Sequence, residues 1–296
     1  MTKSIRIVGS GAVCAIGVGV AQIWASVRAG ISRSASSAVH DKTLDPITMA
    51  LLPEDALPGV PAEVQAHGLT ARQERLLWLA RPALQEALAG SQAAEPMPLF
   101  LALPEWSSDE GMFDTSVWLK LLADAHPAAV DVEASQVFCL GRAAGFHALA
   151  AACAYLQQGR GRVALVGGVD SYLDLSLLNK LDDEERILSA RVNDGFIPGE
   201  GAACLLLTTE PGNEGVPSTI VLGACTAEDP GHRYADAPAK GEGLANAVEK
   251  LRAQMPPPRA AAGVVFAGLN GESFGAKEWG ITNMRHGDLL SPEAML

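Results

Sequence analysis

The chain has 296 residues, of which 48% are hydrophobic, and 22 Lys and Arg against 34 Asp and Glu give a net charge of −12. This length and apolar content predict a sizeable core, in one large domain or two fused halves. The acidic balance argues against nucleic acid or an anionic membrane as the main partner.

The chain begins with a short β-branched run over residues 4–8, which predicts a strand, and Gly9-Ser10-Gly11 predicts a turn after it. Residues 20–28 have apolar positions at helical spacing, and Gly30 is expected to end that helix. Residues 31–68 are rich in Ser, Pro and Asp, so we expect a long loop excursion. Thr70 and Gln73 form a capping-box pattern, which predicts a helix that starts there.

Apolar runs and helical patterns alternate over the rest of the chain. Strands are expected over residues 98–103, 135–140, 162–167, 202–209, 219–224 and 264–267, and helices over 116–125, 143–158, 173–181 and 241–254. The alternation predicts an α/β fold with a mainly parallel sheet, in which 202–209 and 219–224 can be neighbours. Residues 213–217 are the best internal boundary, which separates 1–211 from 212–296.

The glycines of residues 8–14 also suggest a dinucleotide-binding turn, since they follow a strand and precede a helix. That reading needs a third glycine where Cys14 stands and an acidic residue about twenty positions later. The first acidic residue of the chain is Asp41. A nucleotide-dependent oxidoreductase is therefore kept only as a third hypothesis.

Three motifs occur in a fixed order in the middle of the chain. Gly141-Arg-Ala-Ala-Gly145 precedes Phe-His-Ala-Leu149, a Gly-Gly pair at 167–168 precedes Val-Asp-Ser171, and Asp-Gly-Phe-Ile-Pro-Gly-Glu-Gly spans 194–201. This series resembles the β-ketoacyl synthases of the thiolase fold. The resemblance implies an α/β, thiolase-like fold with mainly parallel mixed sheets layered with helices. It makes 1–211 the N-terminal half and 212–296 a C-terminal half that is reduced or truncated.

In that family a cysteine nucleophile stands where this chain has Arg142. A thiolate there is stabilised by the free N–H groups at a helix start, which also form an oxyanion hole; here this start would be Arg142 and Ala143. A guanidinium cannot be acylated in this way at neutral pH. We expect Arg142 to bind an acidic group, to point into a pocket, or to extend into solvent.

Cys139 is the rival nucleophile, and its alternative role is that of a buried structural cysteine. Asn270 falls at a family histidine and cannot titrate, while His286 lies in a polar tail and is expected to be exposed. The resemblance implies structural support of the site by other residues, namely His147, Gly167, Gly168, Asp194, Gly195, Phe196, Gly199, Glu200 and Gly201.

The resemblance implies a ketosynthase-like protein of fatty acid or polyketide biosynthesis that meets an acyl thioester or acyl-carrier protein. Arg142 and Asn270 together predict that it is catalytically degenerate and acts as a binding or partner subunit. It would form a homodimer through residues 135–140 or a heterodimer with an active synthase. The alternative is an active acyltransferase that uses Cys139. We expect neither a cofactor nor a metal, reduced cysteines, and a cytoplasmic location, since no leader or membrane-spanning stretch is evident.

Overall fold

The structure is a computed structural model that describes residues 4–59, 61, 64, 67–89, 91, 95–105, 114–126, 129–211, 219–255 and 263–289. The chain forms two compact units. The first comprises Met1–Lys180 and Pro198–Val221, and the second comprises Leu181–Ile197 and Leu222–Leu296. The boundary predicted at residues 213–217 lies outside the described residues and stays a prediction.

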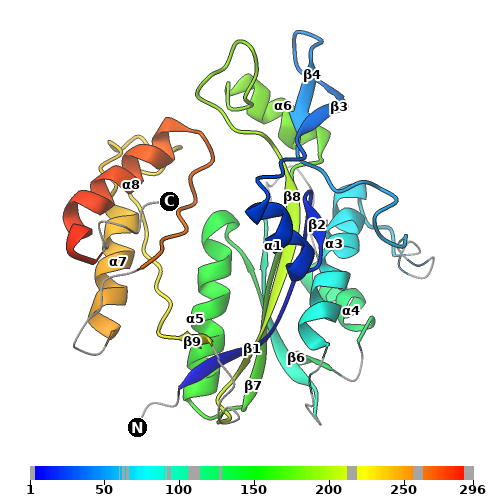
Figure 1. Cartoon of the computed structure of the whole chain (residues 1–296), viewed down its shortest axis with the longest axis vertical. Coiled ribbons are helices and arrows are strands. Elements are labelled where there is room, and N and C mark those ends of the chain that lie inside the picture. The colour runs from blue at the N-terminus through cyan, green and yellow to red at the C-terminus, as the bar shows by residue number, and fades with distance from the viewer. Residues whose placement is uncertain are drawn as a thin grey trace. The chain divides into compact units, whose positions relative to one another are not determined.

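The first unit is built on one mixed sheet (Figure 1). Its strands are β1 (Ile5–Cys14), β2 (Gly17–Val18), β5 (Met97–Leu103), β6 (Val130–Cys139), β7 (Val163–Ser171), β8 (Glu200–Thr208) and β9 (Thr219–Val221). The order is β2-β1-β8-β7-β5-β6, and β9 also pairs with β1. The α/β class is confirmed, but only β5 makes parallel pairs, with β6 and β7. The sequence suggested that β8 and β9 could pair with each other, but each of them instead pairs antiparallel with β1.

Helices cover both faces of this sheet (Figure 1). One apolar cluster joins α3 (Ala71–Leu88) and α4 (Thr115–Ala123) to the sheet, and a second joins α5 (Ala144–Gln157) to the opposite face. Every residue of β5 is buried between the two, which explains why its sequence is apolar throughout rather than alternating. The predicted capping box is confirmed, since Thr70 accepts from the Gln73 N–H and the Gln73 side chain accepts from the Thr70 N–H.

The predicted turn at Gly9-Ser10-Gly11 is wrong. The β1 strand continues through both glycines, which pair with Leu206 and Cys204 of β8. An ideal Cβ on Gly9 or Gly11 would lie 2.3 or 2.0 Å from a backbone carbonyl oxygen of α3. The glycines therefore allow a helix to lie directly on the strand, and the dinucleotide hypothesis loses the loop on which it depends.

Helix α1 (Val20–Arg28) is confirmed with its predicted bounds, but the loop expected after it contains a β-hairpin. Its strands are β3 (Ala35–His40) and β4 (Pro46–Met49), and Ile47 and Met49 are buried. These two buried apolar side chains explain why a strand forms within a segment that is polar overall. The polar composition of the segment gave no indication of them.

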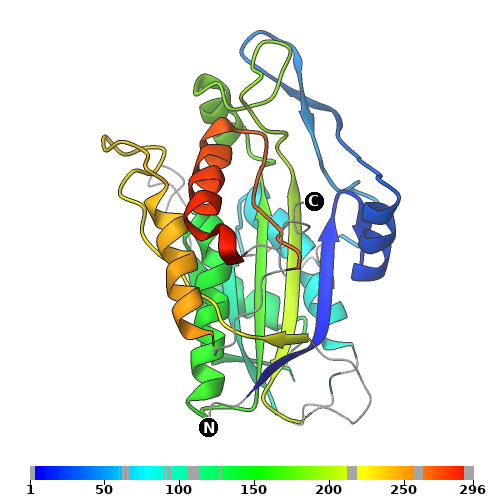
Figure 2. The ribbon, with the colours of Figure 1, turned by 60° about the vertical axis from the view of Figure 1, so that its left-hand side comes forward.

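The second unit contains α7 (Glu242–Gln254), α8 (Ser273–His286) and the short helix η3 (Gly287–Leu289), with α7 and α8 side by side (Figure 2). The strand expected over residues 264–267 is absent from the described structure, where Phe266 is 94% exposed. A strand needs a neighbour for its backbone hydrogen bonds, and no described strand pairs with this segment. His286 was expected to be exposed but is buried, with Nε2 3.0 Å from the Ala245 carbonyl oxygen, because α8 extends through the supposed tail. The α6 helix (Leu175–Asp183) runs across the division between the units.

Candidate functional site

The turn between β6 and α5 carries the expected nucleophile position. It is a single 3-10 turn, η2 (Gly141–Ala143), in which Gly141 has a φ of 54°, a left-handed conformation that favours glycine. Arg142 and Ala143 are exposed, and the buried Ala144 begins α5. The carboxylate of Glu105 lies beside the same turn, 3.8 Å from where a Cβ on Gly141 would be. The strand-to-helix turn that the sequence indicated is therefore present, with Arg142 at its centre.

Cys139 points away from α5. It is the last residue of β6 and packs against the cluster that contains α3 and α4, whereas Phe138 packs against the cluster that contains α5. Successive side chains of a strand alternate between its faces, so the Cys139 thiol is on the opposite side from the helix start. This geometry fits the structural role of Cys139 better than the nucleophilic one.

His147 is half-buried within α5 and stacks on Phe138, with ring centroids 6.4 Å apart. The contact is one of packing between strand and helix. A structural role for His147 stays a prediction.

Two other thiols are buried in the first unit. Burial raises the pKa of Cys153, and it raises the pKa of Cys204 to about 12. Both thiols are therefore protonated at neutral pH and are poor nucleophiles. None of the cysteines in the described part of the chain forms a disulfide bond.

The Glu200 carboxylate is held by four hydrogen bonds in the first unit. Its side chain is fully buried and accepts hydrogen bonds from Arg75 Nη2 at 2.6 Å and Nε at 3.0 Å, Ser171 Oγ at 2.8 Å and the Leu52 N–H at 2.8 Å. One of these four bonds comes from a backbone N–H group, that of Leu52. All its acceptor positions are occupied by the fold.

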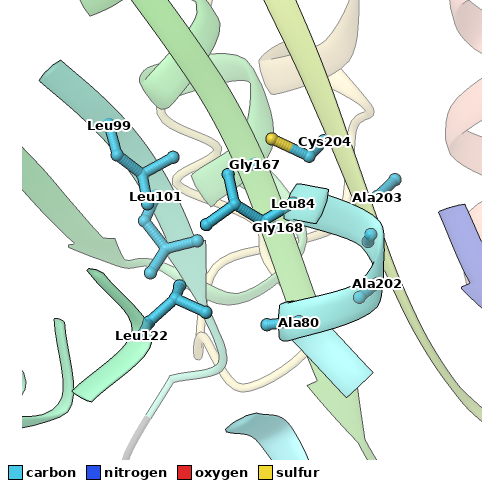
Figure 3. A pocket seen from close by; sticks show the side chains of 11 residues that line it. Ala80, Leu84, Leu99, Leu101, Leu122, Gly167, Gly168, Ala202, Ala203 and Cys204 are labelled. Carbon is cyan, nitrogen blue, oxygen red and sulfur yellow. The ribbon is translucent and has the colours of Figure 1, made fainter. Parts of the chain in front are cut away.

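The glycines beside Glu200 allow close packing of the backbone. Gly199 bridges to Ala50, and a Cβ on Gly201 would lie 2.9 Å from the Val13 carbonyl oxygen. A small pocket between α3 and strands β5, β7 and β8 is lined by Gly167, Gly168 and apolar side chains, with the Cys204 sulfur as its only heteroatom from a side chain (Figure 3). This pocket is part of the core and has no polar side chain to orient a thioester.

Sequence reasoning missed Arg72 and Arg75. Arg72 is buried, donates to the Ser171 carbonyl at 3.2 Å and lies 3.4 Å from Asp170 Oδ1. Burial raises the pKa of Asp170, and the charge of Arg72 partly offsets that rise. A signal was available for Arg72, because it precedes the buried Leu76 by four residues and so falls on the apolar stripe of the helix.

In the second unit, Asn270 is committed to a buried carboxylate. Its Nδ2 donates to Glu272 Oε2 at 2.8 Å, and Glu272 also accepts two bonds from Arg186, at 2.8 and 3.1 Å. Arg233 Nη2 lies 2.8 Å from Glu272 Oε1. The pKa of Arg186 is raised, chiefly by its hydrogen bonds to Glu272. The side chain at the expected histidine position therefore has a structural partner, and sequence gave no signal for the pairing of Arg186 with Glu272.

The second unit also contains contacts of Asp194, Gly195 and Phe196 with the start of α8 and with Arg186. Asp194 accepts from the Ser273 N–H at 2.5 Å and from its hydroxyl at 2.6 Å, which caps the start of α8 and lowers the pKa of Asp194. A Cβ on Gly195 would lie 2.8 Å from the Arg186 carbonyl oxygen, and Phe196 is buried beneath the Arg186 guanidinium. The expected site residues thus fall into two groups, one in each compact unit.

Among the residues that the structure describes, no three His, Cys, Asp or Glu side chains gather as a metal site would require. None of the described helices combines the length and the apolar character needed to cross a bilayer.

Comparison with known protein families gives a match for the middle of the chain. Residues 141–211 match the family profile of the β-ketoacyl synthase N-terminal domain. A search of curated proteins found no match.

Solved ketosynthase structures share the fold of almost the whole chain. One is a type II polyketide synthase acyl-carrier protein in complex with its ketosynthase bound to the hexaketide, at 17% identity, a TM-score of 0.74, and coverage of 98% of this chain and 79% of that one. Another is a ketosynthase in complex with its chain length factor from Xenorhabdus doucetiae, at 20% identity, 0.66, and coverage of 96% and 76%.

A third is the ketosynthase from module 6 of the bacillaene synthase of Bacillus subtilis 168, at 17% identity and a TM-score of 0.71. Our chain is covered to 96% but spans only 55% of that protein. Residues 141–211 therefore carry the β-ketoacyl synthase N-terminal domain signature, and the chain has the thiolase-like fold of the ketosynthases.

Proposed function

We propose that this protein is a ketosynthase-like subunit without an acyl-accepting thiol, which acts as the binding partner of a ketosynthase. The observation that carries the proposal is Arg142 at the centre of the η2 turn, between β6 and α5. A guanidinium at a helix start adds positive charge to the positive end of the helix dipole and cannot form a thioester. The turn keeps the shape of an acylation site but lacks its nucleophile.

The cysteines of the described chain support this proposal. Cys153 and Cys204 have raised pKa values because they are buried, and Cys139 packs on the face opposite α5. None of the three combines an ionised thiol with a helix start. No observation favours Cys139 as a nucleophile, and its acylation would be the result that restores the active-acyltransferase reading.

The partner surface that we propose is the edge of the sheet at β6. Among the described strands, β6 is ten residues long and has one neighbour, β5, so one of its backbone edges has no described strand beside it. Such an edge is suited to pairing with another chain. Leu140 and Phe146, which follow β6, are exposed and would add apolar area to the same interface. Two of the solved ketosynthases with this fold are described as ketosynthases with a chain length factor, which supports a heterodimer, and a second copy of this chain is the other candidate.

Mass spectrometry after incubation with an acyl-coenzyme A thioester tests the loss of the nucleophile. We expect no acyl adduct on the wild type and a single adduct on Arg142→Cys, because the new thiol would lie at a helix start. The double variant Arg142→Cys/Cys139→Ala should behave like Arg142→Cys. An adduct at any cysteine of the wild type, above all Cys139, would contradict the proposal.

Analytical ultracentrifugation tests the partner surface. Phe146→Asp should weaken association with a co-expressed ketosynthase, or self-association, because it places a charge among apolar contacts. Leu175→Asp is the matched control, since Leu175 is also an exposed apolar residue of the first unit but lies in α6, away from the sheet edge. Equal effects of the two substitutions would rule out the β6 edge as the interface.

A role in fatty acid or polyketide synthesis and a cytoplasmic location remain parts of the proposal.

A further inference from the structure

Helix α1 presents its apolar side to solvent. Val20, Trp24 and Val27 are spaced as one face of a helix and are 37%, 59% and 55% exposed, and Ile31, just after the helix, is 44% exposed. Ser26 is the buried residue of the helix. A surface helix normally turns its apolar stripe toward the core, whereas α1 buries Ser26, partly buries Ile23 and leaves these three apolar residues exposed. We call Val20, Trp24, Val27 and Ile31 the α1 stripe.

Polar contacts fix α1 in this orientation. The Glu86 carboxylate of α3 accepts from the Val20 N–H at 2.9 and 3.1 Å and from the Ala12 N–H of β1 at 3.0 Å, so it caps the helix from outside. The Ser26 hydroxyl donates to the Ile16 carbonyl at 2.9 Å. These contacts anchor both the start and the middle of the helix to the sheet, so the outward stripe is held by the fold.

The end of α1 is fixed as well. The Gly30 N–H donates to the Val27 carbonyl at 3.0 Å, the Ile31 N–H donates to the Ser26 carbonyl at 2.9 Å, and Gly30 has a φ of 65°. This pattern is a Schellman motif. It holds Ile31 against the last turn of the helix. Figure 2 shows the helix on the outer side of β1.

The segment of sequence that contains α1 carries the opposite charge to the rest of the chain. Residues 1–40 contain four cations, Lys3, Arg6, Arg28 and Arg33, and no Asp or Glu, whereas residues 41–296 contain all 34 acidic residues. Arg28 and Arg33 are exposed on either side of Ile31 in the sequence. Two exposed cations therefore follow the C-terminal end of α1, while the Glu86 carboxylate lies at its start.

From this arrangement we infer that the α1 stripe docks an acidic amphipathic helix of another protein, with apolar residues on the stripe and Asp or Glu beside Arg28 and Arg33. A parallel two-fold pairing of α1 with its copy would bring the same arginines together, which charge repulsion disfavours. An anionic membrane is also disfavoured, because the short helix offers few cations while the bulk of the chain is strongly acidic. Distant acidic residues of the chain weigh little against such a partner, since exposed charges are screened beyond about 8 Å at physiological ionic strength.

Calorimetric titration with two synthetic helical peptides tests this inference. Both peptides have the same Leu and Val seam, one with Glu and the other with Lys along its flanks. We expect the Glu peptide to bind at least about tenfold more tightly than the Lys peptide, and less tightly at high salt. Trp24→Ala should weaken binding of the Glu peptide by about tenfold or more. The double substitution Arg28→Glu/Arg33→Glu should reverse the preference between the peptides.

Matched controls separate docking from misfolding and from other occupants. Leu175→Ala, at an exposed apolar residue of α6, should leave peptide binding unchanged, and circular dichroism should show that the Trp24→Ala protein is folded. Equal affinity for the two peptides, or no binding of the Glu peptide, would overturn the inference. So would tighter binding to phosphatidylglycerol vesicles than to the Glu peptide, which would assign the stripe to a membrane. Dimerisation of the wild type that Trp24→Ala abolishes would assign it to a second copy and also refute the inference.

Discussion

Removal of the Glu200 carboxylate should be among the most destabilising changes that the first unit can undergo. Glu200→Ala leaves the Arg75 guanidinium, which is only 14% exposed in its side chain, without its carboxylate partner at 2.6 Å. It also removes the acceptor of the Ser171 hydroxyl and of the Leu52 N–H. Breaking a buried ion pair from one side costs about 3–5 kcal/mol. We therefore expect the free energy of unfolding of Glu200→Ala to fall by about 4 kcal/mol.

Glu200→Gln should cost less. The amide keeps the shape of the side chain and one acceptor oxygen, which can still serve Arg75 and Leu52, and its NH₂ group can donate to the Ser171 hydroxyl. The lost charge weakens a hydrogen bond to a charged group, which is worth about 1.5–3 kcal/mol. We therefore expect the free energy of unfolding to increase in the order Glu200→Ala, Glu200→Gln, wild type.

The matched control lies in the loop just after β8. Glu210 pairs with Arg162 at 3.7 Å, but the two side chains are 55% and 80% exposed. Exposed pairs contribute about 0–1 kcal/mol, so Glu210→Ala should change stability by less than about 1 kcal/mol.

Urea unfolding followed by tryptophan fluorescence and by far-ultraviolet circular dichroism measures these differences. Both probes are needed because the chain has two compact units, which need not unfold together. If Glu200→Ala and Glu210→Ala lose the same stability, the claim that Glu200 anchors the first unit is refuted.

Three further predictions follow from particular contacts. Gly11→Ala should lower the free energy of unfolding by about 3 kcal/mol, because its Cβ would fall 2.0 Å from a carbonyl oxygen of α3. The same urea titration measures this change, and a neutral effect would mean that α3 does not lie on β1. Cys204, whose pKa is raised to about 12, should be alkylated by iodoacetamide at pH 8 only after unfolding, whereas the partly exposed Cys225 should react in the folded protein, as peptide mapping can show. The pKa of Asp194 is lowered in the folded state, so its contribution to stability is present above its usual value of 3.8 and is lost as pH falls through the lower folded value. Asp194→Asn should therefore flatten the acid limb of the melting temperature below about pH 4, and an unchanged limb would show that the cap by Asp194 on Ser273 does not matter.

Local patterns in the sequence located most of the elements of the first unit. The capping box at Thr70, the apolar run of β5 and the glycine that ends α1 each depend on neighbours within a few residues, and each is found where expected. The strand-to-helix turn around Arg142 was also visible, because its motif is continuous in the chain. These features are decided by backbone conformation and local hydrogen bonds.

The failures have a common cause in contacts between distant residues. The glycines of β1 resemble a turn until α3 is placed on them, and residues 264–267 resemble a strand although no described strand pairs with them. The local sequence around His286 is typical of an exposed tail, but the packing of α8 on α7 buries this residue. In each case the same local sequence is compatible with two conformations, and a partner far along the chain selects one.

The sequence by itself determined the fold class and placed an arginine at the start of α5. Only the tertiary structure decided which charges pair, since Glu200 and Arg75 are separated by 125 residues, and Glu272 and Arg186 by 86. It alone decided which apolar cluster Cys139 packs against and that Val20, Trp24 and Val27 of α1 face outward. The reason is physical: spacing along the chain fixes which face a side chain occupies, but what covers that face depends on how the elements pack.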